Sequence, residues 1–481
     1  MKLSQLTKGI PLLADHIGQD VEITSLSFDT RTMTPGALFA ALPGSKWDGA
    51  DFIPEALHKG AAAVLCQRPP AQAGPWLAVS NSRAAFAQLA ANWFGHPSDR
   101  MTVIGVTGTN GKTTTTYLLK TMLEKTVGAK VGLIGTNQNM IGGEILPAMR
   151  TTPEAYELQE LLHLMSQEGC THVVMEVSSH ALSLHRTDAI RFRAGIFTNL
   201  TQDHLDFHGT MENYRAAKAR LFDQCEAGIF NLDDEAGRWY TTQVPCKVVT
   251  YSENKSEADL LAKNIRLRSD QVEFEALTLG AISRVRLPIP GGFSIYNALG
   301  VIACGLELGV GLPQIADALA DAPGVKGRVE VVQTPAPYTV IIDYAHTPDA
   351  LEKLLLSVRE FTPGRLICLF GCGGDRDRSK RPLMGAIAGE LADLVILTSD
   401  NPRTEPPELI LDEIETGLPP GGPAVHRECD RRKAIRLALA LGREGDVVVL
   451  AGKGHETYQE IGTKRVHLDE REEIAAFFQT A

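Results

Sequence analysis

The feature that most constrains the fold of this chain is a glycine-rich loop between an apolar run and a helical pattern. Residues 103–114 read VIGVTGTNGKTT, and the helical pattern continues over residues 114–125. Glycines let backbone N–H groups converge on an anion, and the start of a helix adds a positive dipole. Lys112 can reach the β- and γ-phosphates of a nucleotide, and the Thr113 hydroxyl can bind Mg²⁺. The segment therefore predicts a strand, a phosphate-binding loop and a helix, with ATP or GTP as the ligand.

The spacing of the two glycines departs from the common form of this loop. Gly108 and Gly111 are separated by two residues, whereas four residues usually separate them. A tight strand-to-helix turn without a ligand is the alternative. The order of strand, glycines, lysine and two threonines favours the nucleotide site.

The length and the strand pattern predict three α/β domains. A chain of 481 residues is too long for one hydrophobic core. Apolar runs alternate with helical patterns, which is typical of a mostly parallel sheet covered by helices. We expect a small N-terminal α/β domain over 1–98, a central P-loop domain with a doubly wound, mostly parallel sheet over 99–332, and a C-terminal Rossmann-like α/β domain over 333–481. Predicted strands include 61–65, 76–79, 101–106, 130–134, 172–176, 194–198, 228–231, 247–250, 339–343, 365–370, 394–398 and 446–451, with a helix over 82–94 and a linker over 97–100.

Composition narrows the class of protein. The net charge of −11 argues against nucleic acid as the main partner, because binding to phosphates needs a basic face. The eight cysteines form no CxxC pair and are expected to be buried thiols in a reducing compartment. No apolar signal core and no run of about 18 apolar residues occurs, so we expect a cytoplasmic protein that does not enter a membrane.

Polar residues follow two predicted strands of the central domain. Glu176 ends an apolar strand, and carboxylates at such strand ends face the ligand crevice, so Glu176 is a candidate Mg²⁺ ligand beside Thr113. The segment 203–208, which holds two Asp and two His including His204, predicts a metal or phosphate site rather than a polar loop. Lys218, by helical spacing alone, is expected to be a surface lysine.

The third domain carries four polar loops, each directly after a predicted strand. They are 343–348 (DYAHTP), 370–378 (FGCGGDRDR), 399–403 (SDNPR) and 451–456 (AGKGHE). The carboxyl ends of parallel strands meet at one edge of a sheet, so these loops are expected to share a crevice. The arginines there predict a carboxylate or phosphate held by two hydrogen bonds.

Taken together, these motifs resemble the Mur ligase family, whose members form amide bonds with ATP in peptidoglycan synthesis. The matching pieces are 108–114, 176–180, 199–206 and 343–348, with FDTR at 28–31 and PGALF at 35–39 near the start. The segments 373–376 (GGDR), 400–403 (DNPR) and 452–456 (GKGHE) resemble the branch of the family that adds diaminopimelate. The resemblance covers essentially the whole chain.

The resemblance implies a set of site residues. For ATP these are Gly108, Thr109, Asn110, Gly111, Lys112, Thr113, Thr114, Asn297, Arg328 and Asp343. For the UDP-linked substrate they are Phe28, Thr30, Ser45, Lys46, Trp47, Thr151, Thr152, Ser178 and Arg186, and for diaminopimelate Arg376, Asp400, Asn401, Pro402, Arg403, Gly452 and Glu456. The metal set is Thr113, Glu176, His204 and Lys218, with Lys218 as a carbamate; Lys112, Lys218 and His204 are the implied catalytic residues.

The implied reaction joins meso-2,6-diaminopimelate to UDP-N-acetylmuramoyl-L-alanyl-D-glutamate. The γ-carboxylate of D-Glu would attack the γ-phosphorus of ATP. The amine of diaminopimelate would then displace phosphate from the acyl phosphate through a tetrahedral intermediate, with two Mg²⁺ ions neutralising charge. Arg403 is expected to select diaminopimelate over lysine by pairing with its distal carboxylate. The resemblance names no protein partner, and a monomer is expected.

Three other readings of the sequence stay open. The same ligation with L-lysine is opposed by Arg403 and Glu456. A folylpolyglutamate-synthase-like ligase would share the phosphate loop and the Asp-His loop, but the 28–31 motif opposes it. A nucleotide-binding switch module would bind ATP without forming an amide, and it leaves the loops of the third domain unexplained.

Overall fold

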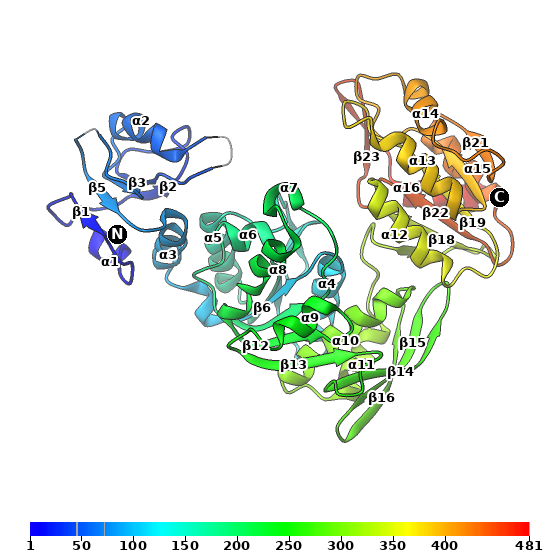
Figure 1. Ribbon diagram of the computed structural model, residues 1–481, viewed down its shortest axis with the longest axis horizontal. Coiled ribbons are helices and arrows are strands. Elements are labelled where there is room, and N and C mark those ends of the chain that lie inside the picture. Colours follow the sequence, from blue (N-terminus) through cyan, green and yellow to red (C-terminus); the bar gives the residue numbers. More distant parts are fainter. Residues whose placement is uncertain (45–46, 72, 481) are drawn as a thin grey trace. The chain divides into compact units, whose positions relative to one another are not determined.

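The computed structural model describes residues 1–44, 47–71 and 73–480. Figure 1 shows the helices and strands of these residues, which form two compact units. The first unit holds residues 1–251 and 303–309, and the second holds 252–302 and 310–481.

The first unit begins with a five-stranded sheet of order β1-β5-β4-β3-β2, in which only β1 runs antiparallel to its neighbour. Helix α3 packs on this sheet; the Asn81 side chain caps its start by accepting from the backbone N–H groups of Arg83 and Ala84, and Gly95, with φ of 72°, ends it. The strands are β1 (Ala14–Asp15), β2 (Ser25–Ser27), β3 (Ala37–Ala40), β4 (Ala63–Cys66) and β5 (Trp76–Ala78); the helices are α1 (Leu3–Leu6), η1 (Gly49–Phe52), α2 (Ile53–His58), α3 (Ser82–Phe94) and η2 (Pro97–Arg100).

The same unit continues with a larger sheet of order β13-β12-β11-β6-β10-β7-β8-β9. Strands β6, β7 and β10–β13 are parallel, and β8 and β9 form an antiparallel hairpin beside β7. Its central strands are buried on both faces, which explains their continuous apolar runs. The strands are β6 (Thr102–Thr107), β7 (Val131–Ile134), β8 (Asn139–Ile141), β9 (Glu144–Leu146), β10 (His172–Glu176), β11 (Phe192–Phe197), β12 (Cys225–Asn231) and β13 (Lys247–Ser252); the helices are α4 (Lys112–Val127), α5 (Ala155–Gln167), α6 (Ser179–Ser183), α7 (Leu205–His208), α8 (Met211–Ala219), η3 (Phe222–Gln224) and α9 (Glu235–Tyr240).

The second unit opens with an antiparallel meander, β14 (Leu260–Leu267), β15 (Val272–Thr278) and β16 (Ala281–Leu287), with α11 (Leu312–Ala320) against β16. Helix α10 (Gly292–Glu307) begins in this unit. A six-stranded sheet follows, of order β17-β18-β22-β19-β20-β21, parallel except for β17. Its strands are β17 (Glu330–Val332), β18 (Thr339–Asp343), β19 (Leu366–Phe370), β20 (Leu394–Leu397), β21 (Ala424–Arg427) and β22 (Val447–Ala451). The helices between them are α12 (Pro348–Arg359), α13 (Lys380–Leu391), α14 (Pro407–Glu415) and α15 (Arg431–Leu441). A separate two-stranded sheet, the hairpin β23 (Tyr458–Ile461) and β24 (Lys464–His467), and helix α16 (Glu470–Thr480) follow.

The predicted fold class is confirmed: the chain is α/β with mostly parallel central sheets. The predicted strands occur to within a few residues, and the helix predicted at 82–94 has those bounds. Residues 97–100, predicted as a linker, instead form η2 with Pro97 and Ser98 buried. The boundaries of the three predicted domains stay a prediction.

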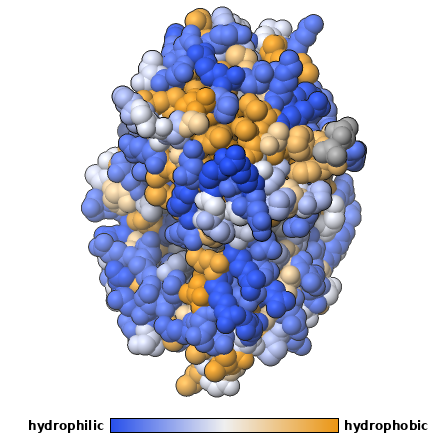
Figure 2. Space-filling model, turned by 90° about the vertical axis from the view of Figure 1, so that its right-hand side faces the viewer, coloured by the Kyte–Doolittle hydropathy of each residue, from blue (hydrophilic) through white to orange (hydrophobic). Residues whose placement is uncertain are grey.

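The surface drawn in Figure 2 is mostly hydrophilic, with apolar residues between the polar ones. Leu279 and Ile282, at the turn between β15 and β16, are among the exposed large apolar side chains. Among the described helices, none is long and apolar enough to cross a membrane. Five of the cysteines are buried as expected, whereas Cys225, Cys246 and Cys429 are only half-buried.

Candidate active site

The glycine-rich loop lies between β6 and α4, as the sequence predicts. The Lys112 ammonium donates to the backbone carbonyls of Gly108 and Thr109, at 3.0 and 2.9 Å, so the lysine curls over the loop. The segment after β11 supports the loop from the side: Asn199 accepts from the backbone N–H groups of Thr109 and Asn110, at 2.8 and 3.0 Å. These hydrogen bonds therefore fix the conformation of the loop at the N-terminus of α4.

At Gly108 the loop leaves no space for a side chain. Its φ of +148° lies outside the conformations that L-residues commonly adopt, and a Cβ would overlap the Thr198 hydroxyl. Thr198 in turn donates to the Asn110 carbonyl at 2.6 Å. The glycine thus lets the loop approach the end of β11 closely.

We expect Gly108→Ala to destabilise the protein by about 1–3 kcal/mol, because it adds backbone strain and a clash, and to abolish ATP binding. Differential scanning calorimetry and ATP titration calorimetry measure both effects. Gly143→Ala is the matched control, because a Cβ there meets no atom within 4 Å. Tight ATP binding by the Gly108 variant would contradict this account of the loop.

Glu176, at the end of β10, accepts three hydrogen bonds beside the loop. Its Oε1 accepts from the Thr113 hydroxyl at 3.0 Å and from the Thr136 backbone N–H at 2.9 Å, while Oε2 accepts from the Thr136 hydroxyl at 3.0 Å. The side chain is 1% exposed. The structure therefore brings together Thr113 and Glu176, two of the predicted Mg²⁺ ligands, and both offer the oxygen atoms that Mg²⁺ prefers.

Lys218 is not the surface residue that helical spacing alone predicts. It is 1% exposed, and its ammonium donates to the Gly108 carbonyl at 2.8 Å. Burial, and then the nearby charge of Lys112, lower the pKa of Lys218 well below its ordinary value. The lysine therefore lies directly behind the phosphate loop, in surroundings that favour its neutral amine.

The Asp-His segment forms a group of rings next to this lysine. His180 lies between His204 and Phe207, with ring centroids at 4.8 and 4.2 Å. Burial and the neighbouring His180 lower the pKa of His208 to about 4, so this ring is neutral at pH 7. Within the described parts of the chain, no three His, Cys, Asp or Glu residues are grouped to hold a metal ion. A metal here would need the Thr113 hydroxyl or a modified Lys218 as well.

The predicted residues for the peptide part of the substrate lie around Glu176. The Thr152 hydroxyl donates to the Glu176 carbonyl at 2.9 Å and lies 3.3 Å from the Ser178 hydroxyl, and the Thr151 hydroxyl lies 3.0 Å from that of Thr136. Arg186 donates to the Thr152 carbonyl at 3.1 Å. These four predicted residues therefore share one side of the loop region.

Glu154 was not predicted from the sequence. It lies among Arg83, Arg150 and Arg186, and these four residues are called the arginine cluster. Arg150 and Arg186 both donate to Glu154 Oε1, at 2.7 and 2.6 Å, and Arg83 lies 3.6 Å from Oε2. Arg83 belongs to α3, so the cluster joins the N-terminal sheet region to the loop before α5. In the sequence, the only feature that could have pointed to Glu154 is its place close to Thr151 and Thr152.

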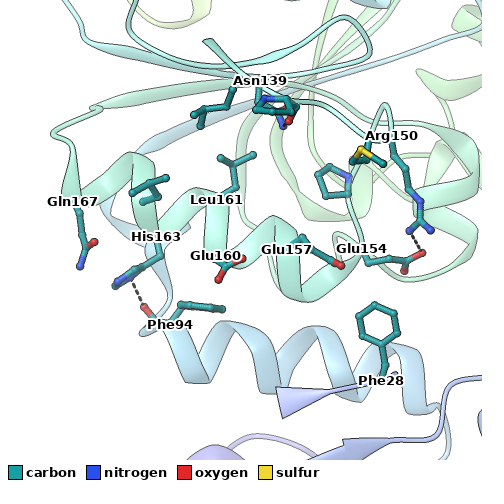
Figure 3. A pocket seen from close by; sticks show the side chains of 15 residues that line it. Phe28, Phe94, Asn139, Arg150, Glu154, Glu157, Glu160, Leu161, His163 and Gln167 are labelled. Carbon is teal, nitrogen blue, oxygen red and sulfur yellow. Dashed lines mark hydrogen bonds and ion pairs between the residues drawn. The ribbon is translucent and has the colours of Figure 1, made fainter. Parts of the chain in front are cut away.

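Two cavities lie in this unit, and the larger one is lined in part by Arg150 and Glu154 of this cluster. The larger, of about 820 Å³, runs along α5; Figure 3 shows Glu154, Glu160 and Gln167 along it, with Phe28 and Phe94 on one side and Asn139 on the other. The smaller, of about 420 Å³, lies in the N-terminal region and is lined by Phe28, Asp29, Thr30, Arg31, Phe39, Trp47 and Phe52. It holds three of the predicted uridine residues, whereas Ser45 and Lys46 lie outside the described residues.

In the second unit, the four polar loops meet at the carboxyl edge of the sheet, as predicted. Asn401 donates to Glu456 Oε2 at 3.1 Å, and the Gly374 N–H donates to the Asn401 carbonyl at 2.9 Å. The Gly452 N–H, after β22, donates to the Asp343 carbonyl at 3.0 Å. Asp400, Asn401 and Pro402 are buried in this edge, and Arg376 is exposed beside it.

Arg403 is held in place by the hairpin β23–β24. Its Nη1 donates to the Gly374 carbonyl at 2.8 Å, its Nε lies 3.0 Å from Glu460 Oε2, and its backbone N–H donates to the Glu460 carbonyl at 3.0 Å. Its φ of 52° is unusual for a residue other than glycine. Glu460 is a further residue that sequence reasoning missed, because nothing in its local pattern points to Arg403.

The remaining predicted ATP residues also lie in the second unit. Asp343 accepts from the backbone N–H groups of Val329 and Ala345, both at 2.8 Å, and burial raises its pKa. The Arg328 guanidinium lies over the Tyr344 ring at 5.6 Å. Asn297 is buried on α10. Their part in ATP binding stays a prediction.

Family models match three successive parts of the chain. They are described as the Mur ligase family catalytic domain (residues 22–94), the Mur ligase middle domain (106–305) and the Mur ligase glutamate ligase domain (327–454).

Curated relatives and solved structures agree with these matches. Proteins named UDP-N-acetylmuramoyl-L-alanyl-D-glutamate–2,6-diaminopimelate ligase from Caldanaerobacter subterraneus and Clostridium acetobutylicum (there ligase 1) are 45% and 44% identical, covering 98% and 96% of this chain and 98% and 95% of their own. A solved structure of a ligase of that name has a TM-score of 0.76 at 32% identity and covers 100% of this chain and 99% of its own. The MurF ligase of Thermotoga maritima in complex with ADP has a TM-score of 0.60 at 19% identity, over 96% and 98%, and shows the same fold.

Proposed function

The chain belongs to the Mur ligase family, and we propose that it joins meso-2,6-diaminopimelate to UDP-N-acetylmuramoyl-L-alanyl-D-glutamate, with conversion of ATP to ADP and phosphate, in peptidoglycan synthesis. The observation that carries the proposal is the loop cluster around Arg403, Asn401 and Glu456 in a chain that also has the phosphate loop. A guanidinium and a carboxylate at one sheet edge suit a ligand with its own carboxylate and amine.

The first step activates a carboxylate. The γ-carboxylate of D-Glu attacks the γ-phosphorus of ATP, the bond to the β–γ bridging oxygen breaks, and ADP leaves. Lys112, already placed over the loop, neutralises the charge that develops on the phosphate oxygens. Thr151, Thr152, Ser178 and Arg186 hold the peptide part of the substrate beside Glu176.

The second step forms the amide. The neutral amine of diaminopimelate attacks the acyl phosphate carbonyl, the nitrogen loses a proton, and phosphate leaves from the tetrahedral intermediate. Asp400, Asn401 and Glu456 orient the amino-acid end of diaminopimelate, and Arg403 holds its distal carboxylate. Phe28, Thr30 and Trp47 form the uridine end of the substrate site in the 420 Å³ cavity.

Mg²⁺ fits the residues beside the phosphate loop. Thr113 and Glu176 present oxygen atoms 3.0 Å apart, and a carbamate on Lys218 would add two more. His204 would complete the set as a nitrogen ligand. Bound there, Mg²⁺ would neutralise charge on the ATP phosphates.

The environment of Lys218 suits carbamate formation. The neutral amine attacks the carbon of CO₂, a C–N bond forms, and one proton is released. Burial, and then the charge of Lys112, lower the pKa of Lys218 well below its usual range, which favours the neutral amine that this step needs.

We expect the wild-type enzyme to lose activity when CO₂ is removed and to regain it with bicarbonate, and Lys218→Arg to lower kcat at least about 100-fold, because arginine cannot become a carbamate metal ligand. A ¹³C NMR signal from ¹³CO₂-treated protein, absent in the Lys218 variant, would identify the carbamate directly. Lys263→Arg, at an exposed lysine on β14, is the control. Full activity without CO₂ would reject the carbamate.

One assay tests the function as a whole. Phosphate release is measured with ATP and UDP-N-acetylmuramoyl-L-alanyl-D-glutamate, with diaminopimelate, lysine or glutamate added one at a time. We expect turnover with diaminopimelate. Preference for lysine or for glutamate would favour the other ligase readings, and ATP binding without turnover would favour the switch module.

A further inference from the structure

Lys453 is a fully buried lysine among the polar loops around Asn401 and Glu456, and it is not one of the predicted site residues. It follows β22, and its side chain is 0% exposed. Its ammonium lies 2.7 Å from Asn401 Oδ1, 2.8 Å from Glu456 Oε2 and 3.4 Å from Asp400 Oδ1. One cation therefore contacts three of the residues that are proposed to bind diaminopimelate.

These contacts fix the direction of the Asn401 side chain. Its Oδ1 accepts from Lys453 and from the Glu460 backbone N–H at 2.9 Å, while its Nδ2 donates to Glu456 at 3.1 Å. Because both donors point to the oxygen, the amide has one favoured orientation. Glu456 is held on the same side by the amide and by Lys453.

The charges of this group also depend on Lys453. Asp400 and Glu456 bring two negative charges to the buried edge, and Lys453 compensates one of them. Asp400 Oδ1 is buried and accepts no hydrogen bond from any described residue. The Lys453 ammonium lies 3.4 Å from this oxygen and offsets its negative charge. Without Lys453 the group would carry one more negative charge.

We propose that Lys453 is a positioning residue that sets amino-acid selectivity, by orienting Asn401 and Glu456 and by keeping the charge of the pocket suited to a ligand with no net charge. The inference rests on the proposed function. Diaminopimelate carries two amines and two carboxylates, whereas lysine carries a net positive charge. Loss of the Lys453 charge would repel the carboxylates of diaminopimelate and attract lysine.

A role in stability alone predicts something different. A buried ion pair that only supports the fold would, when removed, lower the melting temperature and affect all substrates alike. A positioning role changes KM for the amino acid and the ratio between diaminopimelate and lysine. The two roles are therefore separable by kinetics.

The test compares Lys453→Met, which removes both charge and hydrogen bonds, with Lys453→Gln, which keeps N–H donors without the charge. Lys433→Met, an exposed lysine on α15, is the matched control. We expect a rise of at least about 30-fold in KM for diaminopimelate in Lys453→Met. The ratio of kcat/KM for diaminopimelate to that for lysine should fall about tenfold in both variants. KM for ATP and for the UDP-linked substrate should stay within about threefold of wild type.

Two results in a folded variant would overturn the proposal. One is an unchanged KM for diaminopimelate together with an unchanged ratio of kcat/KM for diaminopimelate to that for lysine. The other is an equal rise in KM for diaminopimelate, ATP and the UDP-linked substrate. Failure of both Lys453 variants to fold would assign the lysine to stability and also overturn it. If the wild-type enzyme releases no phosphate with diaminopimelate, the proposed function itself is wrong. Because wild type is measured first, this outcome is distinguished from a failure of the proposal on Lys453.

Discussion

Replacement of Lys112 by alanine is expected to lower kcat/KM for ligation at least about 100-fold, because the phosphate loop then has no ammonium to neutralise charge at the transferring phosphate. The side chain also bridges two carbonyls of its own loop, Gly108 and Thr109, so its loss loosens the loop. Phosphate release with all three substrates measures the effect, and circular dichroism measures the melting temperature.

Lys125→Ala, in the last turn of the same helix, is the control for Lys112. It removes an exposed lysine far from the loop and is expected to keep wild-type kinetics. Ligation at more than about a tenth of the wild-type rate by Lys112→Ala would show that the loop does not act on the transferred phosphate.

Replacement of Arg403 by alanine is expected to remove most activity with diaminopimelate while ATP binding is kept. Breaking a buried charge pair costs roughly 2–5 kcal/mol, or roughly 30-fold to several-thousand-fold in rate. Glu460 and the Gly374 carbonyl already hold Nε and Nη1, and the side chain is 22% exposed. Because a lysine ligand would leave the guanidinium with these two partners, we expect discrimination in the lower part of that range.

Steady-state kinetics with diaminopimelate and with lysine measure the effect of Arg403→Ala, and ATP titration calorimetry checks the nucleotide site. Arg427→Ala is the control, because Arg427 pairs with Asp412 and Glu415 at the surface. Equal kcat/KM for the two amino acids in the wild-type enzyme would rule out Arg403 as the selecting residue.

The parts of the fold that were predicted correctly have strong local signals. Strands β10 and β18 are continuous apolar runs buried on both faces, and their predicted bounds, 172–176 and 339–343, are those of the structure. The loop at 108–114 was predictable because glycines, lysine and threonines occur in a fixed order. The grouping of the third-domain loops followed from the geometry of parallel strands.

The parts that were missed depend on contacts between distant segments. The helical spacing of Lys218 predicts a surface residue. In the structure it is buried and donates to the carbonyl of Gly108, which comes 110 residues earlier, so its local sequence does not reveal the burial. The meander β14–β16 carries charged residues on its exposed face, such as Arg284 and Arg286 around Glu273, which weakens its strand signal. Lys453 needed the structure for the same reason, since its partner Asn401 comes from a different strand end.

The arginine cluster at Glu154 has a consequence for how the substrate arrives. Three guanidinium groups share one carboxylate there, in a chain whose net charge is −11. A net negative charge repels a nucleotide-sugar that carries a diphosphate and carboxylates. The three guanidinium groups outnumber Glu154 and the nearby Glu157, so we expect this local surplus of positive charge to attract the substrate. Such steering is screened over about 10 Å at 0.1 M salt. The association rate of the UDP-linked substrate should therefore depend on ionic strength more strongly than the chemical steps that follow.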